Sequence, residues 1–204
     1  MVEKTKITLS SKELELVCNT DWILTKQVII QKVYVLFGEL AIPMQQLLLE
    51  QADILPGEIK LNGPKIAKGE NYLGLPYVMM DYPRHFKKED TMAIRTMFWW
   101  GNFFSINLQL SGSSKEFFMP ALLQRFSYLQ QNDYWICISN DQWHHHFEKD
   151  NYDPVSNYNI DDFRNVLNRK PFVKIARRIP LKQWNEVPAF LAQSFNEMIE
   201  LLKT

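Results

Sequence analysis

Hydrophobic side chains recur at three- and four-residue steps from Asp21 onward, which predicts one long helix. Pro43 lies within this pattern, so we expect the helix to kink or divide there. A shorter helix over residues 10–19 should precede it, because Ser10 and Glu13 can cap each other's backbone N–H groups. The predicted core stripe of the long helix is Trp22, Ile29, Val33, Leu36, Leu40, Met44 and Leu47.

Two apolar runs on either side of Gly101-Asn102 form the clearest pattern in the chain and predict a β-hairpin over about residues 92–110. A two-residue turn would pair Trp100 with Phe103. One face of the hairpin would then be core, with Met97, Trp99, Phe104, Ile106, Leu108 and Leu110. The other face would be polar along the strands and aromatic at the turn end, with Phe98, Trp100 and Phe103.

The second half of the chain alternates short strands with helices. The predicted elements are a helix near 115–130 opened by Ser113 and Glu116, a strand at 134–139, a helix from Asn159, a strand at 171–179 and a helix at 188–203. Together these patterns predict an α+β fold, with a largely antiparallel sheet around the hairpin and helices from both termini packed on it. We expect a single domain over 1–204, with a separate N-terminal helical lobe over 10–52 left open.

Residues 55–76 contain four of the seven glycines and three prolines. This density is typical of irregular structure and predicts a long ordered loop. Long loops in compact domains often carry function, so the region up to residue 85 becomes a candidate site.

The composition adds no element to the predicted fold, but it argues against some classes of function. The 204 residues carry 23 basic and 23 acidic side chains, and this balance argues against general nucleic-acid binding. The most apolar segment is interrupted by Gln31, Lys32 and Glu39, and no secretory signal is visible, so we expect a soluble cytoplasmic protein without a membrane span. Cys18 and Cys137 are expected to be buried, reduced thiols.

Three of the four histidines lie in a row at 144–146. Consecutive side chains cannot converge on one ion, so this run supplies at most two ligands. A catalytic zinc site needs three. One alternative is therefore a metal-assisted hydrolase whose divalent metal is held by His144, His146 and Glu148 together with His85. The simpler interpretation, which we prefer, is a polar loop, and no cofactor is then predicted.

Aromatic side chains suggest a binding surface, for a protein partner or a small molecule. It would combine the hairpin end with three tyrosines of the 55–85 region. Its residues are Phe98, Trp100, Phe103, Tyr72, Tyr77 and Tyr82. Exposed aromatics of this kind mark ligand or partner surfaces, whereas buried ones are core. Self-association through this face is a further option.

Arg95 falls among the core-facing residues of the hairpin and needs a partner there. Asp81 or Glu70 could pair with it structurally. The functional alternative is an anion-binding pocket in which Arg84 and Arg95 hold the ligand, with His85 as acid or base. The sequence contains no nucleotide-binding glycine motif, no hydrolase serine elbow and no His-Glu-x-x-His, so it does not decide whether the protein is an enzyme.

Overall fold

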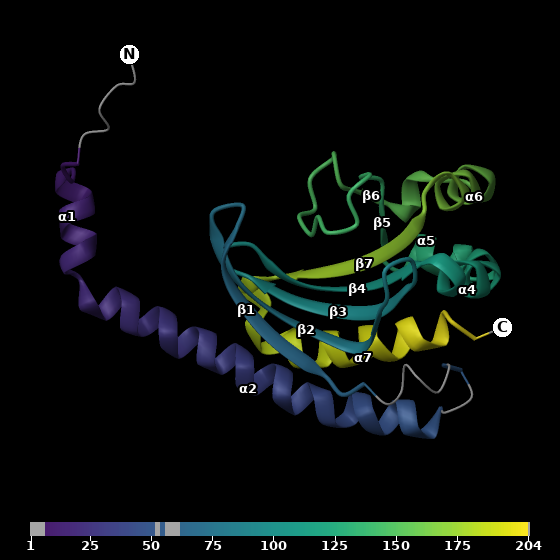
Figure 1. Cartoon of the computed structure of the whole chain (residues 1–204), viewed down its shortest axis with the longest axis horizontal. Coiled ribbons are helices and arrows are strands. Elements are labelled where there is room, and N and C mark those ends of the chain that lie inside the picture. Colours follow the sequence, from purple (N-terminus) through teal and green to yellow (C-terminus); the bar gives the residue numbers. More distant parts are fainter. Residues whose placement is uncertain (1–6, 52–53, 56–61, 204) are drawn as a thin grey trace, which may run out of the picture.

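Two helices open the chain in the computed structural model, which describes residues 7–51, 54–55 and 62–203 (Figure 1). Helix α1 spans Ser11–Cys18, and α2 spans Thr20–Glu50. The predicted capping box at α1 is confirmed, since Ser10 and Glu13 each accept the other's backbone N–H. Helix α2 is not divided at Pro43. The proline ring lies on the exposed side of α2, where water can satisfy the carbonyl that loses its N–H partner.

The strands form one antiparallel sheet, with seven strands in the order β1-β2-β3-β4-β7-β5-β6 within the described residues. Their bounds are β1 Lys65–Tyr72, β2 Leu75–Phe86, β3 Thr91–Trp99, β4 Phe103–Ser111, β5 Trp135–Cys137, β6 Tyr152–Pro154 and β7 Phe172–Pro180. The later helices are α4 Gly112–Gln124, α5 Phe126–Gln131, α6 Ile160–Arg169 and α7 Val187–Glu200, with 3-10 turns η1 Val155–Asn157 and η2 Leu181–Glu186. The α+β prediction, with an antiparallel sheet and helices from both termini, is confirmed.

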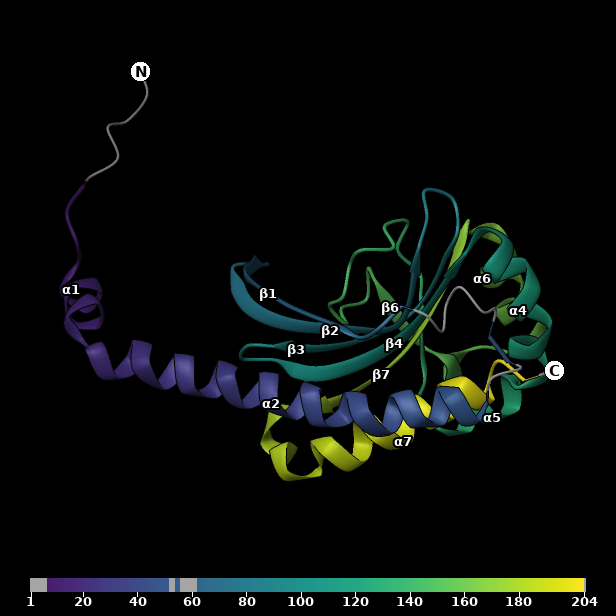
Figure 2. The same ribbon diagram turned by 60° about the horizontal axis from the view of Figure 1, so that its bottom comes forward.

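Helices α2 and α7 lie side by side beneath one face of this sheet (Figures 1 and 2). The stripe of α2 that packs there is Ile30, Val33, Phe37, Leu40, Ala41, Met44 and Leu48. Three of the predicted core residues are in it, while Trp22 remains 48% exposed. In α7 the residues Leu191, Phe195 and Met198 are buried, because they follow the 3.6-residue period of a helix closely.

The central hairpin is present, but its predicted register is wrong by one residue. Trp99 pairs with Phe103, so the connection is the three-residue Trp100–Asn102 rather than Gly101-Asn102 alone. Gly101 has φ +74°, and Asn102 N–H donates to Trp99 O at 3.1 Å. Because side chains alternate between the faces, one extra turn residue moves all of β3 to the opposite face relative to β4.

Phe98 therefore lies with Phe104 and Ile106 on the face that α2 and α7 cover. Met97, Trp99 and Phe103 form a second buried cluster on the other face. A polar loop at 138–151, here named the histidine loop, contributes to this second layer through Phe147, which stacks on Tyr152 at 4.5 Å. Both faces of the central strands are thus buried, which the hairpin pattern alone did not predict.

The predicted loop over 55–76 is wrong for its second half. Residues 65–72 are strand β1, which pairs with β2 through a tight turn at Leu73 and Gly74. Gly69 lies opposite Tyr77, and a Cβ at Gly69 would come within 2.4 Å of the Tyr77 ring. The glycine that suggested a loop is therefore a close-contact position in a strand. Residues 56–61 of the predicted loop lie outside the described residues.

Two smaller predictions are also corrected. Helix α4 begins at Gly112, and its N-cap Ser111 forms no side-chain cap, so the predicted capping box of Ser113 and Glu116 is wrong. The backbone N–H of Ser114 instead donates to the Asp90 carboxylate at 2.9 Å. Cys137 is buried as predicted, whereas Cys18 is exposed.

Replacing Gly112 by alanine is expected to lower the free energy of unfolding by at least about 1–2 kcal/mol, the cost of a left-handed backbone for an L-residue. Gly112 has φ +55°, and a Cβ there would lie 2.1 Å from the backbone oxygen of Glu89. Urea unfolding would measure the loss. Gly63→Ala is the matched control, because no atom of the described residues lies within 4 Å of the position that a Cβ at Gly63 would occupy. Equal stability of the two variants would contradict this account.

By length and composition, α2 could also cross a bilayer, and 28% of its most apolar window is buried. Core helices and signal sequences meet the same criterion. The expectation of a cytoplasmic protein without a membrane span therefore remains a prediction.

Candidate functional site

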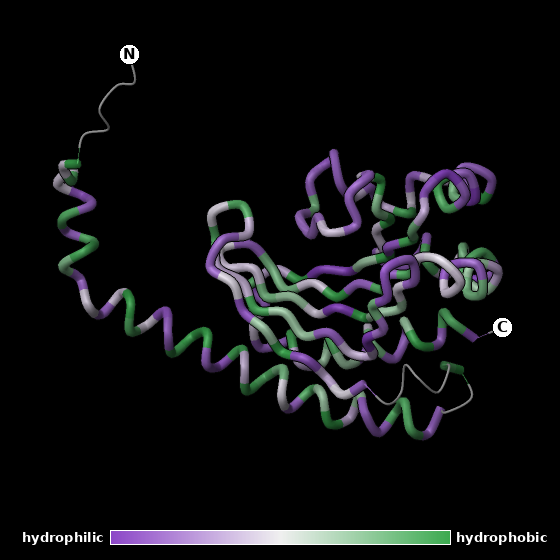
Figure 3. The backbone as a smooth tube through the Cα atoms, in the orientation of Figure 1, coloured by the Kyte–Doolittle hydropathy of each residue, from purple (hydrophilic) through white to green (hydrophobic). Residues whose placement is uncertain are grey.

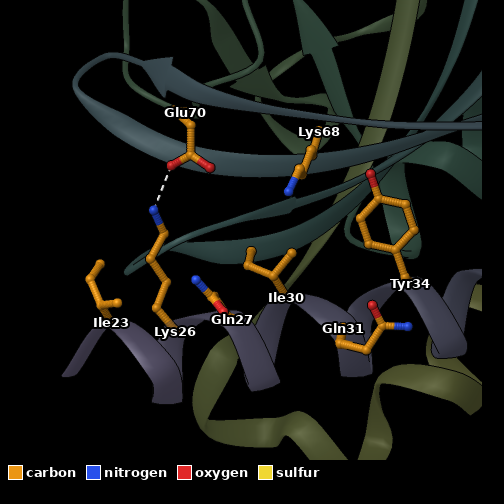
Figure 4. Close-up of a pocket in the computed structure, with 8 residues that line it drawn as sticks. All are labelled: Ile23, Lys26, Gln27, Ile30, Gln31, Tyr34, Lys68 and Glu70. Atoms are coloured by element: carbon orange, nitrogen blue, oxygen red, sulfur yellow. Dashed lines mark hydrogen bonds and ion pairs between the residues drawn. The ribbon is translucent and has the colours of Figure 1, made fainter. Parts of the chain in front are cut away.

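A cleft of about 450 Å³ lies between helix α2 and the edge strand β1 (Figure 4). We call it the α2–β1 cleft. It is lined by Ile23, Lys26, Gln27, Ile30, Gln31, Tyr34, Lys68 and Glu70. Six of these residues come from α2 at three- and four-residue steps, so they share one side of the helix. The other two lie two apart on β1 and therefore share one face of the strand.

One end of the cleft is bridged by an ion pair, in which Lys26 Nζ lies 2.5 Å from Glu70 Oε2. In Figure 4 the amine of Lys68 points from β1 toward α2, and Ile30 and the ring of Tyr34 rise from α2 toward the strand. Within the described part of the chain, Lys68 forms no ion pair. The cleft thus combines an apolar floor with a cation available to a ligand.

Strand β1 is an edge strand, because its only partner in the described sheet is β2. Every second residue of such a strand leaves its N–H and C=O groups unused by the sheet. Its side chains are exposed or half-buried along the whole strand. The backbone of β1 can therefore accept another strand beside the cleft.

A second feature, the buried polar cluster, lies under the histidine loop and consists of Asp81, Arg95, His145 and Lys174. Arg95 forms two bonds to the Asp81 carboxylate, 2.6 Å from Nε and 2.9 Å from Nη2. Its Nη1 lies 3.2 Å from His145 Nε2. The structural pairing of Arg95 with Asp81 considered from the sequence is confirmed, and Glu70 pairs with Lys26 instead.

The hydrogen-bond donors and acceptors that each side chain can offer determine the charge states inside this cluster. A guanidinium can only donate, so His145 Nε2 must accept from Arg95 and its proton must reside on Nδ1. That Nδ1–H points at Lys174 Nζ, 3.1 Å away, which can accept only as a neutral amine. The two remaining amine hydrogens match two acceptors, the backbone oxygens of Gln142 and His144.

Burial agrees with these assignments. Lys174 is 0% exposed, and burial lowers its pKa from 10.5 to about 7. Burial also holds the pKa of His145 well below its usual range. The cluster is thus a closed network that fastens the histidine loop to the sheet, and none of the cavities described here opens onto it.

The predicted aromatic surface is not assembled as one patch. Phe98 and Phe103 are buried on opposite faces of the sheet, and Trp100 is half-buried against Trp22 of α2. Tyr82 is buried and stacks on Phe195. These residues are mainly core because the sheet is covered on both sides.

Tyr72 and Tyr77 have structural contacts instead. The Tyr72 hydroxyl accepts the backbone N–H groups of His145 and His146, at 2.6 and 3.1 Å, so it anchors the histidine loop. The Tyr77 ring packs edge-on against Tyr72 and over Gly69. Of the predicted binding region, only Lys68 and Glu70 line the α2–β1 cleft.

The four proposed metal ligands are not brought together as one group, although the rings of His144 and His146 lie 5.2 Å apart. His85 lies 3.2 Å from Asp90, His146 lies 3.2 Å from Asp150, and His144 lies 3.4 Å from Asp141. In the described residues no group of three His, Cys, Asp or Glu side chains could hold a metal ion. The histidine run is a loop, as preferred from the sequence, although His145 and His146 are buried in it.

The proposed anion pocket is not formed as described. Every nitrogen of the Arg95 guanidinium has a partner within the fold. Arg84 donates from Nε to the backbone oxygen of Gly63, at 2.8 Å. His85 pairs with Asp90 rather than facing a shared ligand position.

Two sets of important residues were missed from the sequence. Lys174 sits in the apolar first half of β7, and its position between Val173 and Ile175 was the available signal for a buried lysine. The cleft residues of α2 carried no such signal, since polar side chains on a helix are ordinarily solvent-facing. No family model, curated protein or solved structure matches the chain.

Proposed function

We propose that the protein is a binding module whose α2–β1 cleft takes up an extended segment of a partner polypeptide. The segment adds to the free edge of β1 as a further strand, and its side chains contact α2. The observation that carries this proposal is the open edge of β1 beside a cleft with a helical wall. Strand addition supplies backbone hydrogen bonds, and the adjacent pocket supplies selectivity.

The cleft also indicates what kind of segment fits. Ile23 and Ile30 offer apolar contact, and Lys68 presents a cation without an ion pair in the described structure. At one end of the cleft, Lys26 and Glu70 already neutralise each other's charge. A segment with one acidic residue next to an apolar one would therefore complement the cleft.

Peptides selected from a random display library against the whole chain test this proposal. Peptides that bind are expected to slow hydrogen exchange of β1 amides and to contain an acidic residue. Lys68→Glu is expected to weaken their binding by about tenfold or more, because it replaces attraction by repulsion. Fluorescence anisotropy measures the affinity.

Lys65→Glu is the matched control, since Lys65 is an exposed lysine of the same strand that does not line the cleft. It should leave peptide affinity within about threefold of the parent value, about half of a tenfold step in binding free energy. Failure to select any peptide, or selection of peptides that ignore Lys68 and protect other amides, would count against the proposal.

A further inference from the structure

A second, independent surface lies on the opposite side of α2 from its buried stripe. Val28, Val35, Ile42 and Leu49 follow one another at seven-residue steps and are 55%, 50%, 67% and 75% exposed. Each helical residue turns by about 100°, so Val35 lies about 200° from the buried Val33. We name these four residues the outer row. Hydrophobic positions recur along the whole of α2 in Figure 3.

Helices that pair with other helices repeat apolar residues at two positions of each heptad, and the outer row supplies one of these two positions. The outer row continues over three heptads on a helix whose other side already packs on the sheet. Gly38 lies near the row, and in the part of the chain that the structure describes no atom is within 4 Å of the position its Cβ would occupy. This open position lets a second helix approach the α2 backbone closely.

A shallow groove of about 350 Å³ lies along the N-terminal half of the row, between Val28 and Glu39. It is lined by Val28, Gln31, Lys32, Val35, Leu36 and Glu39. Lys32 and Glu39 are seven residues apart on the same edge of the groove, one on each side of Val35 along the helix. Neither forms an ion pair within the described residues.

We propose that two copies of the chain pair through this row, with their α2 helices antiparallel and crossing near Val35. Residue 35 lies close to the midpoint of 32 and 39, so a two-fold axis there places Lys32 opposite Glu39 of the other copy, twice. A parallel pair would place Lys32 and Glu39 beside Gln27 and Tyr34 instead. Only the antiparallel arrangement joins opposite charges.

A lipid bilayer is the competing occupant, given the length and apolarity of α2. The row, however, has a cation and an anion beside its central valine. A second copy neutralises both charges, while hydrocarbon neutralises neither. The charge pattern therefore favours a protein partner of the same sequence, on a face that shares Gln31 with the α2–β1 cleft but none of its other lining residues.

Sedimentation equilibrium of the whole chain tests this proposal. We expect a reversible dimer at micromolar concentration. Val35→Asp should weaken dimerisation by about tenfold or more, because it places a charge in an apolar contact. Lys32→Glu and Glu39→Lys should each weaken it, and the double exchange Lys32→Glu with Glu39→Lys should restore it.

Leu73→Asp is the control, because Leu73 is 64% exposed on a turn away from α2. Circular dichroism confirms that each variant is folded. A chain that stays monomeric, a dimer that ignores Val35→Asp, or a double exchange that fails to restore dimerisation would overturn the proposal. So would a monomer that binds neutral phosphatidylcholine vesicles through Val35, which would assign the row to lipid.

Discussion

Replacing Arg95 by alanine is expected to lower the free energy of unfolding by about 3–5 kcal/mol, the usual cost of removing one partner of a buried ion pair. The side chains of Arg95 and Asp81 are only 11% and 14% exposed. The substitution leaves the Asp81 carboxylate without its two bonds and His145 Nε2 without a donor. Guanidinium unfolding at neutral pH gives the measurement.

Arg84→Ala is the matched control for this loss. Arg84 is an arginine on the neighbouring strand. Its guanidinium donates to the backbone oxygen of Gly63 and, among the described residues, holds no buried carboxylate. Its replacement should cost no more than about 1 kcal/mol, the net value of an ordinary hydrogen bond. The combined variant Arg95→Met with Asp81→Leu should recover part of the Arg95→Ala loss, because no charge is left unpaired. A loss below about 1 kcal/mol for Arg95→Ala would show that the pair is not shielded from water.

The free energy of unfolding is expected to rise with pH between about 7 and about 10.5 through Lys174. In this range the unfolded lysine still holds its proton, while the folded one has released it. Because the unfolded state binds more protons, raising the pH favours the fold, by up to about 1.4 kcal/mol per pH unit. Urea unfolding at a series of pH values measures the slope.

Lys174→Met isolates this contribution, because every other titrating group is common to both proteins. Cys137 and Tyr152 work in the opposite direction at alkaline pH, since burial raises the pKa of each. The free energy of unfolding of the parent minus that of the variant should therefore rise between pH of about 7 and about 10.5, even if the parent's own stability changes little with pH. Equal slopes would mean that Lys174 keeps its proton in the fold, and the proton assignment within the buried polar cluster would be wrong.

Periodicity along the sequence was enough for the hairpin, the terminal helices and the α+β class. It was not enough for the hairpin register, because Gly101 is compatible with a connection of either two or three residues. It also did not predict β1, since Gly69 is required by contact with Tyr77, which no local pattern reveals. The faces assigned to the aromatic residues of β3 were wrong as a direct result of the register.

The candidate sites depended still more on distant contacts. Asp81 was correctly named as a partner for Arg95, because a buried arginine must have a carboxylate nearby. The α2–β1 cleft could not be foreseen, since it joins residues more than 30 positions apart whose relative placement is set by packing of α2 on the sheet. Exposure of the outer row likewise follows from which stripe of α2 the sheet buries.

The two edge strands of the sheet differ in length, and this difference limits how copies of this protein can associate. Edge strand β1 has eight residues, whereas β6, the strand at the opposite edge, has three. Open-ended stacking of copies into a fibre would need two long edge strands that can pair with each other. Because one edge strand is long and the other is very short, the two edges do not match, and this mismatch disfavours open-ended stacking of copies edge to edge.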